Sequence, residues 1–181
     1  MEDLLLPFVT VLLAEIGDKT QLAVFCLALR SRSRLQLLIS IILAFIVADG
    51  IAVILGDFLA KFIPNIKSIT GIVFILCGIA ILFKQKSKEE NECVIGEHSF
   101  LSGFGLMLIS EMGDKTQLVS GLFATKYDPL LVFIGAVSAL ALLSTITIYL
   151  GKYIVKRIDE KTVSKIAAII FILIGLASFI S

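Results

Sequence analysis

Residues 15–21 read Glu-Ile-Gly-Asp-Lys-Thr-Gln, and residues 111–117 read Glu-Met-Gly-Asp-Lys-Thr-Gln. The two copies start 96 residues apart, and each lies near the middle of a long apolar segment. Two carboxylates and a lysine inside an apolar membrane segment cost several kcal/mol unless they face a partner, water or an ion. The repetition of so costly a motif therefore indicates a membrane ion site that is built from both copies.

The composition is that of a membrane protein. Of the 181 residues, 58% are hydrophobic and the mean hydropathy is +1.03, whereas soluble domains are roughly 45–50% apolar. The net charge of +1 indicates no nucleic-acid partner. The chain starts Met1-Glu2-Asp3, without the basic residues of a signal peptide, so we expect the first apolar segment to remain in the mature protein.

Six segments are candidates for membrane helices, which need about 20 mostly apolar residues, and the third of them is short. The sequence therefore predicts an all-α membrane protein with helices at 4–29, 35–56, 68–83, 99–125, 129–154 and 166–180. Polar connectors are expected at 57–67 and 156–165.

The strongly polar stretch 84–98 divides the helices into two groups of three. We expect a first three-helix repeat at 1–84, a linker at 85–98 and a second three-helix repeat at 99–181. The groups correspond beyond the motif, because Gly56 aligns with Gly151 and Gly78 with Gly175. An odd number of helices in each repeat makes the second repeat enter the membrane from the opposite side. Such inverted repeats place their binding site near the midplane, where the halves meet.

Lysine and arginine are unevenly distributed over the expected loops. The loops after the first, third and fifth helices hold 11 of the 16 basic residues, and the opposite side of the membrane holds 3. The remaining two are Lys19 and Lys115, inside the motifs. Because basic loops stay on the cytoplasmic side, we expect a cytoplasmic linker and both termini outside.

The spacing within the motif brings oxygen atoms together. A glutamate and an aspartate three residues apart lie on neighbouring faces of one helix, one turn apart. Gly17 and Gly113 permit either close backbone approach or a local break in the helix, and either one exposes carbonyl oxygens. We expect a metal site formed by Glu15, Asp18, Glu111 and Asp114, with Thr20, Gln21, Thr116 and Gln117 as neutral oxygen donors.

Oxygen ligands alone favour a hard divalent cation such as Mn²⁺, Ca²⁺ or Mg²⁺. Zinc and copper sites use histidine or cysteine, but His98 lies in the linker and Cys26 lies about three turns from Glu15. Four carboxylates in one apolar volume cannot all stay ionised without a cation, because desolvation and mutual repulsion oppose their charge. We therefore expect exchange of a divalent cation against protons, with no cofactor beyond the transported ion.

Several polar residues near the site have more than one interpretation. Lys19 and Lys115 either offset charge at the site or form interhelical ion pairs, Asp18 with Lys115 and Asp114 with Lys19. Asp49 is a single intramembrane carboxylate whose counterpart is near Ser144, so it either makes the site asymmetric or reaches a water cavity. Ser110 is a candidate for a further asymmetric ligand.

The motif Glu-x-Gly-Asp-Lys-Thr, present twice, resembles the hallmark of the Gdt family of Mn²⁺ and Ca²⁺ cation/proton antiporters. The family pattern is Glu-x-Gly-Asp-Lys-Ser/Thr in each of two three-helix repeats, and the resemblance extends over essentially the whole chain. It implies a cation site at the two acidic motifs. The short linker is typical of a minimal prokaryotic member, for which Mn²⁺ efflux across the cell (inner) membrane is the first expectation.

Other classes of function fit the sequence less well. An exporter of small organic cations such as basic amino acids would bind an amine, and a non-transporting structural protein would not need two intramembrane acidic motifs. An enzyme is not expected, because the predicted helices hold no histidine, no Cys-x-x-Cys and no nucleophile beside a base. The sequence also lacks a Gly-x-x-x-x-Gly-Lys-Ser/Thr loop, so uphill transport would need an ion gradient. The sequence predicts no particular oligomeric state.

Overall fold

The computed structural model describes residues 1–31, 33–63, 66–83, 100–154 and 160–178. These ranges contain helices and turns but no strand. The helices are α1 (Glu2–Glu15), α2 (Lys19–Arg30), α3 (Arg34–Phe62), α4 (Ile66–Phe83), α5 (Phe100–Glu111), α6 (Lys115–Ala124), α7 (Pro129–Ile154) and α8 (Glu160–Ala177). The predicted linker at 85–98 lies outside the described residues.

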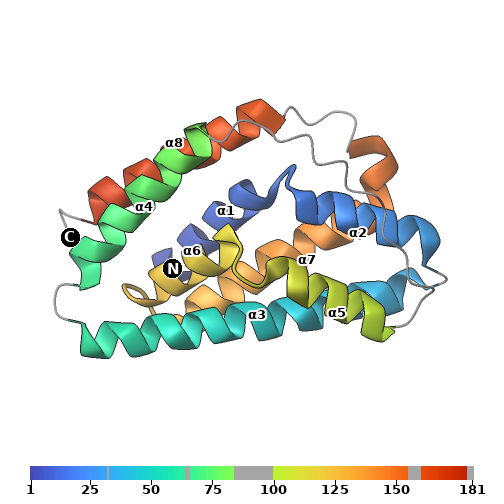
Figure 1. Cartoon of the computed structure of the whole chain (residues 1–181), viewed down its shortest axis with the longest axis horizontal. Helices are drawn as coiled ribbons and strands as arrows, with labels where there is room; N and C mark the ends of the chain where they lie inside the picture. Colours follow the sequence, from blue (N-terminus) through green and yellow to red (C-terminus); the bar gives the residue numbers. More distant parts are fainter. Residues whose placement is uncertain (32, 64–65, 84–99, 155–159, 179–181) are drawn as a thin grey trace.

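Each acidic motif interrupts a helix. The predicted helix at 4–29 is divided into α1 and α2, and the predicted helix at 99–125 is divided into α5 and α6, as Figure 1 shows. The break falls at a glycine with positive φ in both cases, 79° at Gly17 and 81° at Gly113. Glycine adopts this backbone conformation at little cost because it has no Cβ. The local break, one of the two alternatives that the sequence left open, is therefore the one adopted.

The other predicted helices are present: α7 has the predicted bounds, and the other three differ at one or both ends. Helix α3 continues to Phe62, six residues past the predicted end, so the prediction of a connector from Asp57 onward was wrong. Asp57 and Lys61, one helical turn apart, form an ion pair of 2.6 Å that supports this extension. Helix α8 begins at Glu160 and ends at Ala177, so the prediction of 166–180 placed both ends too late.

Two helices in the described part of the chain are long and apolar enough to cross a membrane on those criteria alone. They are Arg34–Phe62 and the stretch Pro129–Leu150 of α7. Two shorter apolar stretches, Ser68–Ala80 and Lys165–Ala177, lie in α4 and α8. The half-helices on either side of each motif are too short to meet the same criterion, because the motif divides their apolar segments.

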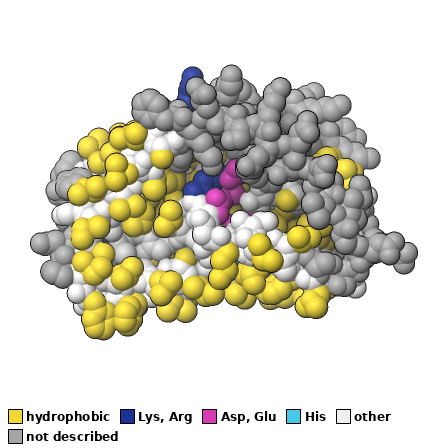
Figure 2. All heavy atoms as spheres, viewed as in Figure 1, with side chains coloured by type: hydrophobic (Ala, Val, Ile, Leu, Met, Phe, Trp, Pro, Cys, Tyr) yellow, Lys and Arg dark blue, Asp and Glu magenta, His cyan; other side chains and the backbone are white. Residues whose placement is uncertain are grey.

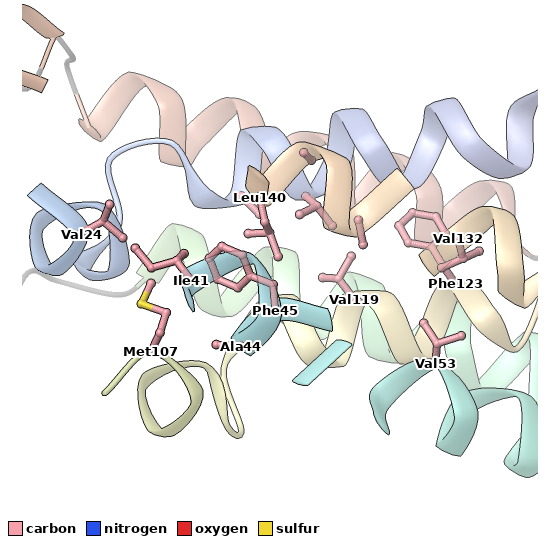
Figure 3. Close-up of a cluster of buried hydrophobic side chains, with 14 of the residues drawn as sticks. Val24, Ile41, Ala44, Phe45, Val53, Met107, Val119, Phe123, Val132 and Leu140 are labelled. Atoms are coloured by element: carbon pink, nitrogen blue, oxygen red, sulfur yellow. The ribbon is translucent and has the colours of Figure 1, made fainter. Parts of the chain in front are cut away.

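The core lies where α3 meets the broken helices and α7. Figure 3 shows Phe45 of α3 close to Leu140 of α7 and Val119 of α6, with Ile41 between it and Val24 of α2. All five side chains are buried. Large apolar side chains also cover the outside, for example Ile109, which is 76% exposed. Figure 2 shows hydrophobic side chains across most of the described part of one face. Such a surface is suited to lipid.

Glycines allow the helices to approach closely. Helices α4 and α8 lie side by side (Figure 1), and a Cβ added at Gly78 would lie 2.8 Å from the Ala168 carbonyl oxygen. The reciprocal contact is as close, because a Cβ at Gly175 would lie 2.7 Å from the Gly71 carbonyl oxygen. Small residues serve this purpose at helix contacts in membranes. The correspondence of Gly78 with Gly175 thus reflects packing.

Candidate cation-binding site

The two motif breaks have the same local geometry. Each glutamate is the last residue of a half-helix, Glu15 in α1 and Glu111 in α5. Each aspartate is the N-cap of the next half-helix, with φ −82° and ψ 169° at Asp18 and φ −78° and ψ 166° at Asp114. The glycine between them turns the chain, so both carboxylates of a motif lie beside the break.

A glutamine closes each break. The Gln21 side-chain oxygen accepts a hydrogen bond from the Gly17 N–H at 3.1 Å. The Gln117 side-chain oxygen accepts one from the Gly113 N–H at 2.7 Å. Gln117 also donates from its Nε2 to the Ala48 carbonyl oxygen of α3 at 3.0 Å. Each glutamine therefore satisfies a backbone donor that the broken helix leaves free. The role of Gln21 and Gln117 as ion ligands stays a prediction.

The two halves exchange hydrogen bonds at the glutamates. The Thr116 hydroxyl of α6 donates to Oε1 of Glu15, and Thr20 of α2 is hydrogen-bonded to Glu111. Glu15 and Glu111 are only 1% and 2% exposed. Each glutamate is thus held by the threonine of the other motif copy, so the site requires both halves of the chain.

Three carboxylates from both halves form an acidic cluster. One oxygen each of Glu15, Asp18 and Asp114 lie within 4.8 Å of one another. The Lys115 ammonium lies 2.5 Å from Oδ2 of Asp18 and 3.8 Å from Oε1 of Glu15, which confirms the predicted interhelical pair of Asp18 with Lys115. The Lys19 side chain lies outside the described part of the structure, and so does its predicted pair with Asp114.

The acidic cluster is partly open to the surface. The Lys115 and Asp18 side chains are 28% and 24% exposed. Figure 2 shows a small patch of basic and acidic side chains near the centre of a face that is otherwise largely hydrophobic. A charged opening in an apolar surface is a feature of ion pathways through membranes.

Glu111 lies near this cluster but is not among its three members. Its carboxylate is within electrostatic range of Glu15, Asp114 and Asp49. Oε1 of Glu111 and Oε2 of Glu15 are buried and have no hydrogen-bond partner among the described residues. Because buried polar atoms are nearly always satisfied, two unsatisfied carboxylate oxygens at one site indicate a place for a ligand.

Asp49 belongs to the interior of the site. It is 2% exposed, and its Oδ1 accepts a hydrogen bond of 2.9 Å from the Ser120 hydroxyl of α6. The structure therefore shows Asp49 as a buried carboxylate bonded to α6, and its role in an asymmetric cation site stays a prediction. Sequence reasoning missed Ser120, although it follows Thr116 by four residues and so lies on the same face of α6.

The structure does not bring Ser110 together with the carboxylates, because its side chain is exposed. Within the described ranges, it also places no free thiol near them. Cys26 is disulfide-bonded, and Cys77 is the free cysteine among the described residues, in α4. Among the described side chains, the site therefore consists of oxygen donors and the Lys115 ammonium group.

A small cavity adjoins Glu15 on the side of α2 and α7. The cavity volume is about 10 Å³, which is about enough for one water molecule. Its lining includes Glu15, Gln21 and Val24 from the first half and Ser144 and Thr147 from α7. Ser144, the position that corresponds to Asp49, thus reaches the opposite side of the same site.

Buried carboxylates from two similar half-sites, a nearby ammonium group and a water-sized cavity define a membrane transporter for small cations. The family model described as "Divalent cation/proton antiporter GDT1" matches residues 3–89 and 99–181. The chain belongs to this family, so the resemblance noted in the sequence is confirmed. It is a cation/proton antiporter and not an enzyme.

Several relatives of the chain agree with this family. A Vibrio cholerae protein named "Putative manganese exporter" is 30% identical over 98% of this chain and 90% of its own length. "GDT1-like protein 5" of Oryza sativa subsp. japonica is 27% identical over 93% of this chain and 90% of its own length. "Divalent cation/proton antiporter GDT1" of Saccharomyces cerevisiae is 32% identical over 42% of this chain and 28% of its own length. No solved structure matches the chain.

Proposed function

We propose that this protein exports Mn²⁺ from the cytosol in exchange for protons, with Ca²⁺ as the alternative ion. The observation that carries the proposal is the acidic cluster, in which Glu15, Asp18 and Asp114 from both halves place oxygens within 4.8 Å. With Glu111 these residues are the proposed ligands. The manganese-exporter name of the Vibrio cholerae relative supports the choice of ion.

The chemistry of the site supports an exchange. A divalent cation needs ionised carboxylates, and its departure leaves them repelling one another in an apolar environment. Protons or the Lys115 ammonium then neutralise part of that charge. An organic cation is a poorer candidate, because the cavity beside Glu15 has room for about one water molecule.

We further propose that the chain crosses the membrane six times, as two inverted repeats. In this arrangement α1 with α2 forms one crossing and α5 with α6 another, and the matching geometry at Asp18 and Asp114 supports their equivalence. The start of α1 and the end of α8 lie in the left half of Figure 1. With the bias of basic residues, this favours termini outside and a cytoplasmic linker, in the inner membrane of a prokaryotic cell.

The test is Mn²⁺ flux into proteoliposomes with and without an imposed pH gradient, with Ca²⁺ as competitor. We expect flux that depends on the proton gradient and is abolished in Glu111→Gln. The matched control is Glu2→Gln, which removes an exposed carboxylate at the start of α1 and should transport normally. Equal flux in Glu111→Gln and wild type would contradict the ligand role, and flux indifferent to pH would contradict proton coupling.

A further inference from the structure

Asp49 is a buried carboxylate outside the set of proposed ligands. It lies one residue past the midpoint of α3 and is 2% exposed. The Ser120 hydroxyl, 2.9 Å from Oδ1, is the partner that the described part of the chain provides for this side chain. One neutral donor does not replace the water around a full negative charge. The position therefore suits the neutral acid, which needs no cationic partner.

The described charges of α5 and α6 do not offset a negative charge on Asp49. Lys115, the basic residue of α6, pairs with Asp18 at 2.5 Å. Asp114, the N-cap of α6, belongs to the acidic cluster. Glu111, the charged residue of α5, is within electrostatic range of Asp49 and repels its ionised form. The neighbour that acts on Asp49 through its charge is thus another carboxylate.

The other helices beside α3 supply no positive charge among their described side chains. The stretch Pro129–Leu150 of α7 contains no Asp, Glu, Lys or Arg, and its titratable residue, Tyr149, is exposed near the end of that stretch. The basic residues of α2, Lys19 and Arg30, have side chains outside the described part of the structure. Ionisation of Asp49 is therefore costly as long as the neighbouring carboxylate of α5 is also ionised.

A cation at the proposed ligands changes this balance. A divalent cation bound by Glu111 replaces a negative charge near Asp49 by a net positive one, so repulsion becomes attraction. The acid then dissociates into a carboxylate and a proton, and no other bond changes. In the reverse direction, protonation of Asp49 removes the attraction and weakens the binding of the cation. Such coupling is reciprocal, as an exchange of cations against protons requires.

The two halves of the chain differ at this point. The acidic motif occurs in both, but Ser144 occupies the position that corresponds to Asp49, and Val24 the position that corresponds to Ser120. The hydrogen-bonded pair of Asp49 and Ser120 therefore has no equivalent in the other half. Asp49 is also not among the three residues whose carboxylate oxygens lie within 4.8 Å of one another. Its place outside the cluster suits a task other than cation ligation.

We propose that Asp49 carries a proton that the transported cation displaces, and that Ser120 positions this carboxyl group. The inference rests on the proposed function and assigns a proton of the exchange to one residue. Asp49 does not need to touch the cation, because the charge at Glu111 links the two events. The Ser120 hydroxyl can donate to Oδ1 whether the group is protonated or ionised, so the hydrogen bond can persist through the exchange.

The test uses two variants that separate the carboxyl group from its hydrogen bond. Asp49→Asn keeps an oxygen that can accept from Ser120 but cannot ionise, whereas Ser120→Ala removes the bond and keeps the carboxyl group. Calorimetric titration of detergent-solubilised protein with Mn²⁺, in buffers of different ionisation enthalpy, gives the number of protons released per ion. At mildly acidic pH we expect Asp49→Asn to bind Mn²⁺ and release about one proton fewer than wild type. Ser120→Ala should release the wild-type number.

Transport gives a second measurement on the same variants. In proteoliposomes, Asp49→Asn should lose most of the Mn²⁺ flux that a pH gradient drives, while the exchange of labelled against unlabelled Mn²⁺ without a gradient continues. The matched control is Asp57→Asn, which makes the same substitution in α3 at an exposed carboxylate paired with Lys61, and it should behave as wild type. Wild-type proton release in folded Asp49→Asn would overturn the inference. Complete loss of Mn²⁺ binding would also overturn it, because Asp49 would then be a ligand.

Infrared difference spectra decide the question if Asp49→Asn fails to fold in a thermal-unfolding measurement. Addition of Mn²⁺ to the wild type should remove a carboxylic-acid C=O band, and Ser120→Ala should shift the frequency of that band because the acid loses a hydrogen bond. A missing band, or one that Ser120→Ala leaves unshifted, would contradict the assignment to Asp49. Failure of the proposed function is separate, because wild-type protein itself would then show no proton-dependent Mn²⁺ flux.

Discussion

Replacing Lys115 by methionine should tighten Mn²⁺ binding and slow transport. The Lys115 ammonium lies 2.5 Å from Asp18 and 3.8 Å from Glu15, so it occupies the place of a cation at the acidic cluster. A metal ion that binds these carboxylates must displace or repel this ammonium group. Methionine has a similar length and no charge, so the variant removes the competitor and retains most of the packing.

The size of the effect follows from the distance between Lys115 and Glu15. At an effective dielectric constant of about 20, two unit charges separated by the observed 3.8 Å attract by about 4 kcal/mol. Desolvation of the ammonium group offsets much of this attraction. If about a third remains, about 1.4 kcal/mol, the dissociation constant of Mn²⁺ should fall about tenfold. The same gain should slow cation release and therefore turnover.

The assay is isothermal titration of detergent-solubilised protein with Mn²⁺ at mildly alkaline pH, followed by flux in proteoliposomes. The control is Lys61→Met, which breaks the exposed ion pair with Asp57 in the last turns of α3 and should leave binding unchanged. Weaker or unchanged Mn²⁺ binding in Lys115→Met would refute the idea that Lys115 competes with the cation. It would indicate that the lysine serves only to join the halves.

Two further predictions concern stability and use matched glycines. Gly113→Ala should destabilise the protein by about 1–2 kcal/mol. The cause is the positive φ alone, because nothing lies within 4 Å of the added Cβ. The control Gly105→Ala is equally uncrowded but has no positive φ, so it should not lower the midpoint of thermal unfolding. Gly56→Ala should destabilise by about 1–3 kcal/mol or more through overpacking against Gly121, whereas Gly50→Ala meets only Phe133 at 3.7 Å and should be tolerated. Equal midpoints within either pair would contradict the corresponding argument.

The sequence pointed to carboxylates that the structure brings together, but it did not determine their arrangement, and their role as ligands stays a prediction. Charged residues inside apolar segments identify Glu15, Asp18 and Asp114, and opposite charge predicts the pair of Asp18 with Lys115. The choice between a break at Gly17 and close backbone approach could not be made, because glycine permits both. The bond of Ser120 to Asp49 was not predicted, because the sequence does not show which hydroxyl meets a carboxylate on another helix.

Helix ends were predicted less well where the local signal was ambiguous. Charged residues at 57–61 were interpreted as a connector, but Asp57 and Lys61 are also spaced to form an ion pair on one helical face. The charged stretch before Ile166 likewise supplies the start of α8 at Glu160. Charged residues alone do not distinguish a loop from a helix, and tertiary packing decides which of the two forms.

Because each glutamate is hydrogen-bonded to the threonine of the other motif copy, the two halves of the chain could not be separated without consequence. Produced alone, residues 1–84 would contain Glu15 without Thr116, and residues 99–181 would contain Glu111 without Thr20. Two such fragments would have to associate before either glutamate regained its partner. The affinity of the fragments for each other would then be coupled to their affinity for the cation. A mutation in one motif copy would therefore also impair the other.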